Sequence, residues 1–170
     1  AEIISVYGDI KDRDTWLKAL QGVDYVFHFA AQTSGYTANK EPLSDLQINL
    51  VPVLQMLEAC REGDFHPKIL FAGTVTQAGL TQQCPVNEDV QDLPLTIYDI
   101  HKLAGEKYFQ YYAKEVGIPS VTLRIANVYG PGSSAGGADR GVLNLMIRNG
   151  LNDKALTVYD DGTQVRDYIF

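Results

Sequence analysis

The sequence predicts an α/β fold in which a parallel sheet carries helices on both faces. Near-continuous apolar runs of strand length, such as Asp24–Ala31 (DYVFHFAA), alternate along the chain with segments of helical periodicity. Strands buried on both faces of a parallel sheet show runs of this kind. The 170 residues, 45% hydrophobic and 21% charged, also suit a single globular domain with an ordinary core.

The predicted strands are short apolar runs bounded by polar residues and turn residues. They are Ile3–Tyr7, Asp24–Ala31, Lys68–Ala72, Val121–Ala126 and Leu156–Tyr159. Two segments are predicted loops, Gly79–Leu95 and the glycine-rich Gly130–Gly141. The second is either a ligand-gated segment or a plain connection. Because helices separate successive strands, we expect the strands to be parallel.

The predicted helices show apolar side chains at helical spacing. They are Asp14–Leu20, Leu43–Arg61, Tyr98–Val116 and Val142–Leu151. Pro52 lies inside the second of these and should kink it or move its start to a later residue. The third should end at Gly117, because glycine adopts the left-handed conformation that follows many helices.

Composition argues against several classes of function. The net charge is −7 and the sequence pI is about 4.8, and the absence of a Lys/Arg run disfavours nucleic acid or an acidic membrane surface as partner. Cys60 and Cys84 are the only cysteines, which fits a reducing compartment. The sequence contains neither a membrane-spanning apolar run nor a visible signal peptide, so we expect a cytoplasmic protein.

The histidines do not suggest a metal site. His28 lies in a predicted strand, His66 in a loop and His101 in a helix, so they are spread along the chain. His101 is adjacent to Lys102 and should point away from the face that carries Tyr98. We therefore interpret all three as structural or exposed.

The segment Tyr98–Lys102 (YDIHK) carries the sharpest chemical signal. Its tyrosine and lysine lie one helical turn apart, on the same face. An ammonium group, together with an oxidised nicotinamide, would lower the pKa of the phenol from its usual value near 10 and let it exchange a proton while hydride moves. The alternative is an accidental pair on a tyrosine-rich helix.

Thr74 follows the strand Lys68–Ala72, at the end where open α/β sheets place their ligands. Its hydroxyl could bond the same substrate oxygen as Tyr98. The alternative is a threonine that only shapes a turn.

A series of motifs in order resembles a known family. They are GDI (Gly8–Ile10), FHFAA (Phe27–Ala31), Asn49, AGTVTQAG (Ala72–Gly79), YDIHK (Tyr98–Lys102), LRIANVYGPG (Leu123–Gly132) and VRDYIF (Val165–Phe170). Over nearly its whole length the chain is similar to the extended short-chain dehydrogenase/reductase family, and most of all to UDP-galactose 4-epimerase-like nucleotide-sugar epimerases and dehydratases.

The resemblance implies a Rossmann-like, doubly wound parallel sheet in three αβα layers. Residues 1–126 would be a partial NAD(P)-binding domain, and residues 127–170 the start of a substrate-binding region interleaved with it. The family's Gly-rich turn, which supports a pyrophosphate, would precede Ala1, as would the residue that selects NAD or NADP. Family members also continue past Phe170. We therefore expect that this chain lacks part of its cofactor site and is inactive by itself.

The resemblance also implies roles for individual residues. Thr74, Tyr98 and Lys102 match catalytic positions. The positions that would bind NAD, or NADP as the alternative, are Asp9, Ile10, Phe29, Ala30, Ala31, Thr33, Asn49, Tyr98, Lys102 and Ala126. The positions that would bind a nucleotide-diphosphate sugar are Thr74, Asn127, Asn144, Tyr159 and Arg166. Taken alone, Asn127 could shape a turn and Arg166 could pair with Asp160 or Asp167.

The residues after Thr74 disfavour elimination. Sugar dehydratases of this family carry an Asp-Glu pair there, and the related decarboxylases carry Glu at the place of Thr76, whereas this chain has Val75 and Thr76. The favoured function is an NAD-dependent nucleotide-sugar epimerase that oxidises a sugar hydroxyl and then reduces the ketone again. The alternatives are a dehydrogenase or reductase of a nucleotide sugar or secondary alcohol, and a non-catalytic NAD(P)-sensing protein.

The resemblance further implies a homodimer. The helix with Asn49 and the helix with Tyr98 and Lys102 would pair with their copies in a four-helix bundle. The aromatic stretch Tyr108–Tyr112 could supply part of that face.

Overall fold

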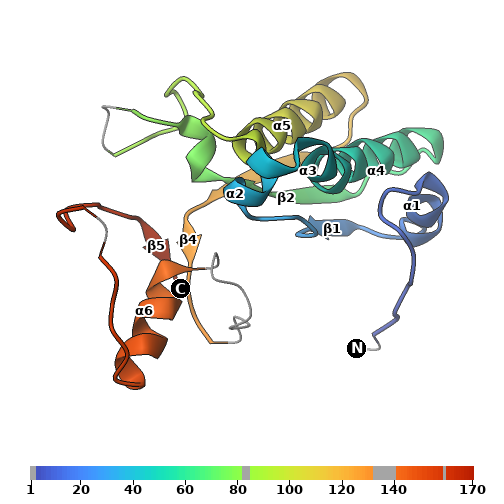
Figure 1. The fold of residues 1–170 in the computed structure, drawn as a ribbon. Coiled ribbons are helices and arrows are strands. Elements are labelled where there is room, and N and C mark those ends of the chain that lie inside the picture. The colour runs from blue at the N-terminus through green and yellow to red at the C-terminus, as the bar shows by residue number, and fades with distance from the viewer. Residues whose placement is uncertain (1–2, 82–84, 132–140, 159) are drawn as a thin grey trace. The chain divides into compact units, whose positions relative to one another are not determined.

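The computed structural model describes residues 3–81, 85–131, 141–158 and 160–170 (Figure 1). They fall into two compact units, Ala1–Arg124 and Ile125–Phe170. The first unit is built on a sheet of strand order β1-β2-β3, with β1 at Tyr25–His28, β2 at Lys68–Thr74 and β3 at Ser120–Ile125.

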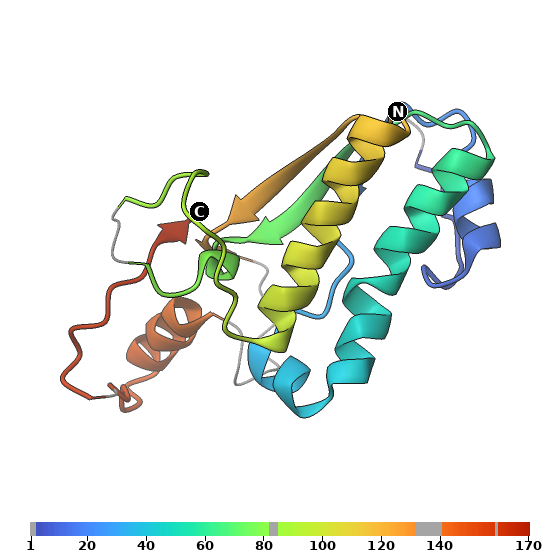
Figure 2. The same cartoon turned by 90° about the horizontal axis from the view of Figure 1, so that it is seen from above.

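The sheet is parallel where its register is defined. Tyr25 of β1 lies opposite Lys68 of β2, and His28 lies opposite Phe71. The backbone N–H of Ile69 donates to the carbonyl of Pro119 at 2.9 Å, just before β3 begins. Figure 2 shows β2 and β3 running in the same direction. The predicted α/β class with parallel strands is therefore confirmed, and the carboxyl ends of the strands share one edge of the sheet.

Local sequence signals account for two helices of this unit. Helix α1 (Arg13–Ala19) starts where the side chain of Asp12 accepts from the backbone N–H of Asp14. Helix α5 (Ile97–Glu115) starts with a capping box in which Thr96 and Asp99 satisfy each other's backbone N–H groups. It ends just before Gly117, which has a φ of +79° as expected for a glycine that follows a helix.

The predicted helix Leu43–Arg61 is divided into α3 (Pro42–Asn49) and α4 (Val51–Glu62). Pro52 lies in the first turn of α4, where its missing N–H is tolerated. The prediction that Pro52 would kink the helix or delay its start is thus confirmed. A further short helix, α2 (Gly35–Lys40), was not predicted, because six residues carry too little periodicity to identify.

Helices α4 and α5 lie side by side over one face of the sheet (Figures 1 and 2). Their buried side chains, among them Met56, Leu57 and Phe109, pack with Ile69 and Phe71 of β2. This cluster is the hydrophobic core of the first unit and holds α5 against β2. On the opposite face, the alternate side chains of β1 and β3 are exposed, among them Tyr25, Phe27 and Leu123.

The second unit contains α6 (Val142–Leu151) and a two-stranded parallel sheet of β4 (Asn127–Val128) and β5 (Tyr168–Ile169). Helix α6 has the predicted bounds. The pairing of β4 with β5 was not predicted, because two-residue strands leave no periodic signal. Cys84, Tyr159 and most of the loop predicted at Gly130–Gly141 lie outside the described residues.

Two predicted strands are wrong. Ile3–Tyr7 is irregular and highly exposed, with Tyr7 94% accessible, and 156–158 is irregular and exposed as well. A strand needs a neighbour for its backbone groups, and among the described residues neither segment pairs with one. Strand β1 is also shorter than predicted, because Phe29–Ala31 leaves the ladder after His28.

Candidate active site

The end of β2 forms a tight turn that carries Thr74. Thr74 is the last residue of β2, it is 8% exposed, and it caps the short 3-10 helix η1 (Val75–Ala78). A side chain at Gly73 would approach Thr122 of β3 to 2.7 Å, and one at Gly79 would meet the carbonyl of Leu93 at 1.8 Å. Gly79 also has a φ of +66°. The two glycines thus allow close backbone packing on both sides of the turn.

Lys102 points from α5 to the end of β2. Its Nζ donates to the carbonyl oxygen of Ala72 at 2.6 Å and lies 4.7 Å from the ring centroid of Phe71. Burial lowers the pKa of Lys102 to about 8, while the charge of Asp45 opposes this shift. A buried amine of this kind can gain or lose a proton close to neutral pH.

Tyr98 lies one turn before Lys102 on the same helix, with its ring centroid 6.0 Å from Nζ. Burial raises the pKa of the Tyr98 phenol to about 12, and the negative charges of Asp99 and Asp45 act in the same direction. The sequence predicted a lowered pKa. That prediction includes the charge of an oxidised nicotinamide and stays a prediction. The protein's own groups raise the pKa, because desolvation and two carboxylates outweigh the ammonium of Lys102, which is bonded to Ala72.

A chain of hydroxyl groups joins Thr74 to α5. The Oγ1 atoms of Thr74 and Thr76 lie 2.8 Å apart, and Thr76 Oγ1 donates to Asp99 Oδ1 at 2.5 Å. Asp99 directly follows Tyr98 in the sequence. Behind this chain, Gln77 of η1 donates to Glu106 of α5 at 2.6 Å. The turn that carries Thr74 is therefore held against the helix that carries Tyr98.

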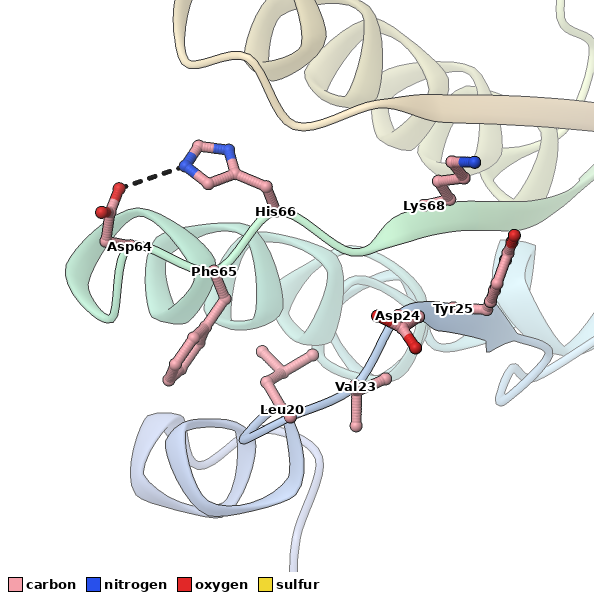
Figure 3. Close-up of a pocket in the computed structure, with 9 residues that line it drawn as sticks. Leu20, Val23, Asp24, Tyr25, Asp64, Phe65, His66 and Lys68 are labelled. Atoms are coloured by element: carbon pink, nitrogen blue, oxygen red, sulfur yellow. Dashed lines mark hydrogen bonds and ion pairs between the residues drawn. The ribbon is translucent and has the colours of Figure 1, made fainter.

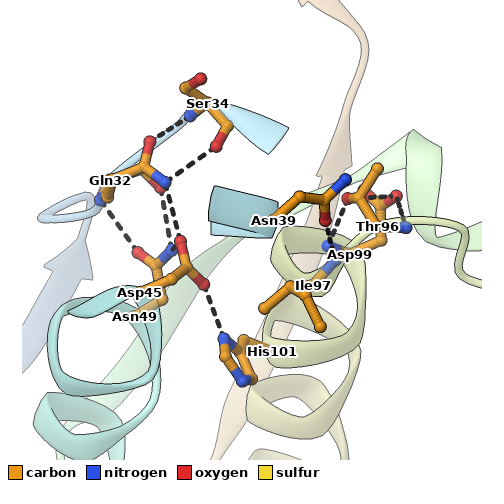
Figure 4. A network of polar contacts seen from close by, with 9 residues as sticks. All are labelled: Gln32, Ser34, Asn39, Asp45, Asn49, Thr96, Ile97, Asp99 and His101. Carbon is orange, nitrogen blue, oxygen red and sulfur yellow. Dashed lines mark hydrogen bonds and ion pairs between the residues drawn. The ribbon is translucent and has the colours of Figure 1, made fainter. Parts of the chain in front are cut away.

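A second polar network centres on Asp45 of α3, which is 1% exposed (Figure 4). Its Oδ1 accepts from Gln32 Nε2 and from Asn49 Nδ2, both at 2.8 Å. Its Oδ2 lies 2.6 Å from Nδ1 of His101 on α5. His101 thus has the structural role expected of it, and Asp45 joins α3, α5 and the segment after β1.

Asn49 clamps the backbone that follows β1. Its side chain accepts from the N–H of Gln32 and donates to the carbonyl of the same residue, both at 2.9 Å. These two contacts hold the segment Phe29–Thr33 at the carboxyl end of β1. Phe29, Ala30 and Thr33 are exposed there, at the same sheet edge as Thr74. Small alanine side chains at such an edge permit close approach of a ligand to the backbone.

Asp9 and Ile10 precede α1. The Asp9 carboxylate is exposed and accepts from the backbone N–H of Lys11 at 2.9 Å, a contact that lowers its pKa. The carbonyl of Ile10 accepts from the indole of Trp16 at 2.7 Å. The side chain of Asp9 is therefore accessible to a ligand.

Apart from Thr74, the predicted substrate residues belong to the second unit. Asn127 Nδ2 donates to the carbonyl of Asp167 at 2.9 Å, and this bond ties β4 to the residue next to Arg166. Arg166 is exposed and donates to the carbonyl of Val165 at 2.8 Å. Asn144 lies in the first turn of α6, and Ala126 lies between β3 and β4. Tyr159 lies outside the described residues.

Sequence reasoning missed Gln32, Asp45 and Asp99, and it treated Thr76 only as a residue unable to do acid–base chemistry. Asp45 had a detectable signal, because it lies one helical turn before Asn49 and so on the same face. Asp99 had a signal as well, since Thr96 and Asp99 have the spacing of a capping box. Their contacts with other elements depend on tertiary packing.

A separate open cavity of about 540 Å³ lies at the opposite end of the strands (Figure 3). Tyr25 and Lys68, the first residues of β1 and β2, line it together with Asp24, Phe65 and His66. It contains none of the predicted site residues. Ligands of open α/β sheets bind beyond the carboxyl ends of strands, so this cavity does not compete with the site around Thr74.

Among the described residues, no group of His, Cys, Asp or Glu side chains could hold a metal ion. Within the same part of the chain, no helix is both long and apolar enough to cross a membrane.

The parallel sheet, with a threonine at the end of β2 and a Tyr–Lys pair on the adjoining helix, defines a dehydrogenase-like α/β domain. The model of the NAD-dependent epimerase/dehydratase family matches residues 1–170, and the chain belongs to this family. The resemblance inferred from the motifs is therefore confirmed.

Curated relatives support this assignment. The chain is 32% identical over 167 residues to a putative UDP-glucose 4-epimerase of Methanocaldococcus jannaschii, a match that covers 97% of this chain and 54% of the relative. It is 30% identical over 166 residues to the UDP-glucose 4-epimerase of Mycolicibacterium smegmatis, covering 97% and 53%. The chain thus spans about half the length of these relatives.

Solved structures agree on the fold. A UDP-N-acetylglucosamine 4-epimerase from Methanobrevibacter ruminantium, in complex with UDP-N-acetylmuramic acid, has a TM-score of 0.89 at 31% identity, covering 95% of this chain and 52% of that one. The UDP-glucose 4-epimerase of Thermus thermophilus, in complex with NAD, has a TM-score of 0.82 at 30% identity, covering 95% and 54%. The predicted Rossmann-like fold class is confirmed, and the prediction of NAD as cofactor agrees with the family and with this complex.

Proposed function

We propose that the full-length protein is an NAD-dependent epimerase of nucleotide-linked sugars. One observation supports the proposal: two sets of contacts join the end of β2, which carries Thr74, to the helix that carries Tyr98 and Lys102. Lys102 bonds Ala72, two residues before Thr74, and Asp99, one residue after Tyr98, is bonded to Thr74 through Thr76. A hydroxyl, a phenol and an ammonium group at the carboxyl end of a parallel strand suit reversible oxidation of an alcohol.

The residues at this edge fit a dinucleotide cofactor. Small side chains follow β1 at Ala30 and Ala31, where the backbone is held by Asn49, and Asp9 offers an accessible carboxylate. The residues proposed to hold NAD are Asp9, Ile10, Phe29, Ala30, Ala31, Thr33, Asn49, Tyr98, Lys102 and Ala126. When bound, NAD supplies a reversible hydride acceptor and a positive charge that favours the phenolate of Tyr98.

The protein's own residues would accept and return the proton of the sugar hydroxyl. Tyr98 takes the proton of the reacting sugar hydroxyl and returns it when the ketone is reduced on its other face. Lys102, anchored on Ala72, places a positive charge behind the phenol. Thr74 holds the reacting oxygen. Thr76 is engaged with Asp99 and carries no acid or base of its own, so elimination from the sugar has no proton acceptor at that position.

The nucleotide-sugar part of the proposal rests on the second unit and on the relatives. Asn127, Asn144 and Arg166 offer amide and guanidinium donors, and Arg grips a diphosphate well because its donors form a planar fork. Of the relatives and neighbours named above, one is named as a putative UDP-glucose 4-epimerase and the others as 4-epimerases of UDP-linked sugars.

The test uses full-length protein with UDP-glucose and NAD, followed by absorbance at the wavelength of NADH and by sugar analysis. Isomerised sugar without net NADH supports the epimerase. Stoichiometric NADH would instead indicate a dehydrogenase, and cofactor binding without turnover would indicate a sensor. Tyr98→Phe should lower kcat about 10²- to 10⁴-fold. The control Tyr25→Phe, at the amino end of β1, should leave kcat unchanged.

We further infer that the protein acts in the cytoplasm as a homodimer through α3 and α5. These two helices pack against each other, and Tyr108 and Tyr111 of α5 present exposed aromatic surface. Sedimentation of full-length protein as a monomer at micromolar concentration would contradict the dimer.

A further inference from the structure

Thr74, Thr76 and Asp99 form one continuous hydrogen-bonded chain. Thr74 Oγ1 lies 2.8 Å from Thr76 Oγ1, and Thr76 Oγ1 donates to Asp99 Oδ1 at 2.5 Å. Thr74 is 8% exposed and Asp99 is 3% exposed. The distances alone leave open which of the two threonines donates in the first contact.

Asp99 acts as an acceptor at both of its oxygens. Its Oδ2 accepts from the backbone N–H of Thr96 at 3.1 Å and from the hydroxyl of the same residue at 2.7 Å. The carboxylate also lies in the first turn of α5, where the helix dipole favours negative charge. An ionised carboxylate has no hydrogen to donate, so Thr76 must be the donor to Oδ1.

The number of hydroxyl hydrogens then determines which group donates in each of these hydrogen bonds. A threonine hydroxyl has one hydrogen. Thr76 uses its hydrogen on Asp99, so the contact between the threonines uses the hydrogen of Thr74. Thr74 Oγ1 also accepts from the backbone N–H of Thr76 at 3.3 Å. What Thr74 retains for a ligand is an acceptor lone pair.

We propose that Asp99, acting through Thr76, makes Thr74 a hydrogen-bond acceptor, so that the site selects a ligand that presents a hydroxyl donor at the reacting position. Asp99 and Thr76 are positioning residues in this scheme, since neither contacts the ligand. The inference rests on the proposed function, because it takes the reacting group to be a sugar hydroxyl. In the complex with NADH, a neutral Tyr98 phenol donates to the same oxygen, so the single hydrogen of the sugar hydroxyl is left for Thr74; in the proposed reaction with NAD, that hydrogen passes to Tyr98 instead.

The experiment compares UDP-glucose with its 4-deoxy-4-fluoro analogue, in which fluorine cannot donate a hydrogen bond. Dissociation constants are measured by calorimetry on full-length protein with NADH, so that no hydride can leave the sugar. Loss of the donor should weaken binding to the parent protein on the order of tenfold.

Two variants change the direction of the hydrogen bonds from Thr74 through Thr76 to Asp99, each in a different way. Thr76→Val frees the hydrogen of Thr74, so the preference for UDP-glucose should shrink to about threefold or less. Thr76→Ser keeps the hydroxyl and should retain the parent's preference. In Asp99→Asn, the N–H and hydroxyl of Thr96 require the amide oxygen. The amide nitrogen then faces Thr76 and reverses the chain, so Thr74 donates and the preference shrinks as well.

Equal binding of the two sugars to the parent, or an undiminished preference in both Thr76→Val and Asp99→Asn, would overturn the inference while leaving the epimerase proposal intact. Binding of neither sugar would overturn the proposed function and this inference with it. Thermal unfolding of each variant checks that it is folded, and Thr76→Val and Asp99→Asn provide independent tests should either fail to fold.

Discussion

The side-chain nitrogen of Lys102 donates a 2.6 Å hydrogen bond to the carbonyl of Ala72 and so joins α5 to the end of β2. Burial lowers the pKa of Lys102 from 10.5 to about 8. Between these two pH values the unfolded chain binds more protons than the native one, so the free energy of unfolding increases as pH rises. Below about pH 8 the cost of burying the ammonium group is fully present.

Lys102→Met removes this titration. Between about pH 8 and pH 10.5, the free energy of unfolding of the native protein relative to the variant should rise by up to about 3 kcal/mol. Urea denaturation across that range measures the difference. Lys107→Met, an exposed lysine on the same helix, is the matched control. A difference between native protein and Lys102→Met that is independent of pH would contradict the prediction.

His28 should resist protonation. It is buried between Trp16 and Phe71, and burial lowers its pKa from 6.5 to about 4, with the charge of Lys102 acting in the same direction. The native state binds fewer protons than the unfolded one in this window. The free energy of unfolding should therefore fall by up to about 3 kcal/mol as pH drops from about 6.5 to about 4.

NMR titration of the histidine Cε1 protons measures this directly. His28 should titrate near pH 4. His66 serves as internal reference, because its hydrogen bond to the Asp64 carboxylate raises its pKa above 6.5. A midpoint for His28 at or above that of His66 would show that the ring is not desolvated.

The buried contact between Asp45 and His101 should couple the stabilities of α3 and α5. In a double-mutant cycle of Asp45→Ala and His101→Ala, we expect a coupling energy of about 1.5–3 kcal/mol. Each single substitution breaks the same hydrogen bond to a buried carboxylate, so the double variant loses less than the sum of the two. The exposed pair Asp64 and His66 should show a much smaller coupling. Additive effects of the two buried substitutions would mean that the contact contributes nothing.

Phe109 should carry a large share of the packing between α5 and the sheet. It is 1% exposed, and its ring centroid lies 4.8 Å from that of Phe71. Phe109→Ala should lower the free energy of unfolding by about 3–5 kcal/mol, because it leaves a cavity in the core. Lys114→Ala, at an exposed position of the same helix, should change it by about 0.5 kcal/mol or less. Similar decreases in the free energy of unfolding for the two variants would contradict the assignment of Phe109 to the core.

Elements with strong local signals were predictable from the sequence. The helix predicted at Tyr98–Val116 is α5, Ile97–Glu115, and the strand predicted at Lys68–Ala72 is β2, Lys68–Thr74. Hydrophobic periodicity, capping residues and a following glycine are properties of neighbouring residues, so they act before any tertiary contact forms. Ile3–Tyr7 has strand composition as well, yet it pairs with no strand among the described residues.

The candidate site divides in the same way. The sequence by itself determined that Thr74 lies at a strand end and that Tyr98 and Lys102 lie on one face of a helix. Spacing along a regular element defines the direction in which each side chain points. Only the tertiary structure decided that Lys102 bonds Ala72, that Asp45 meets His101, and that burial raises the pKa of Tyr98. These outcomes depend on which groups from distant elements exclude water from one another, and that is a property of packing.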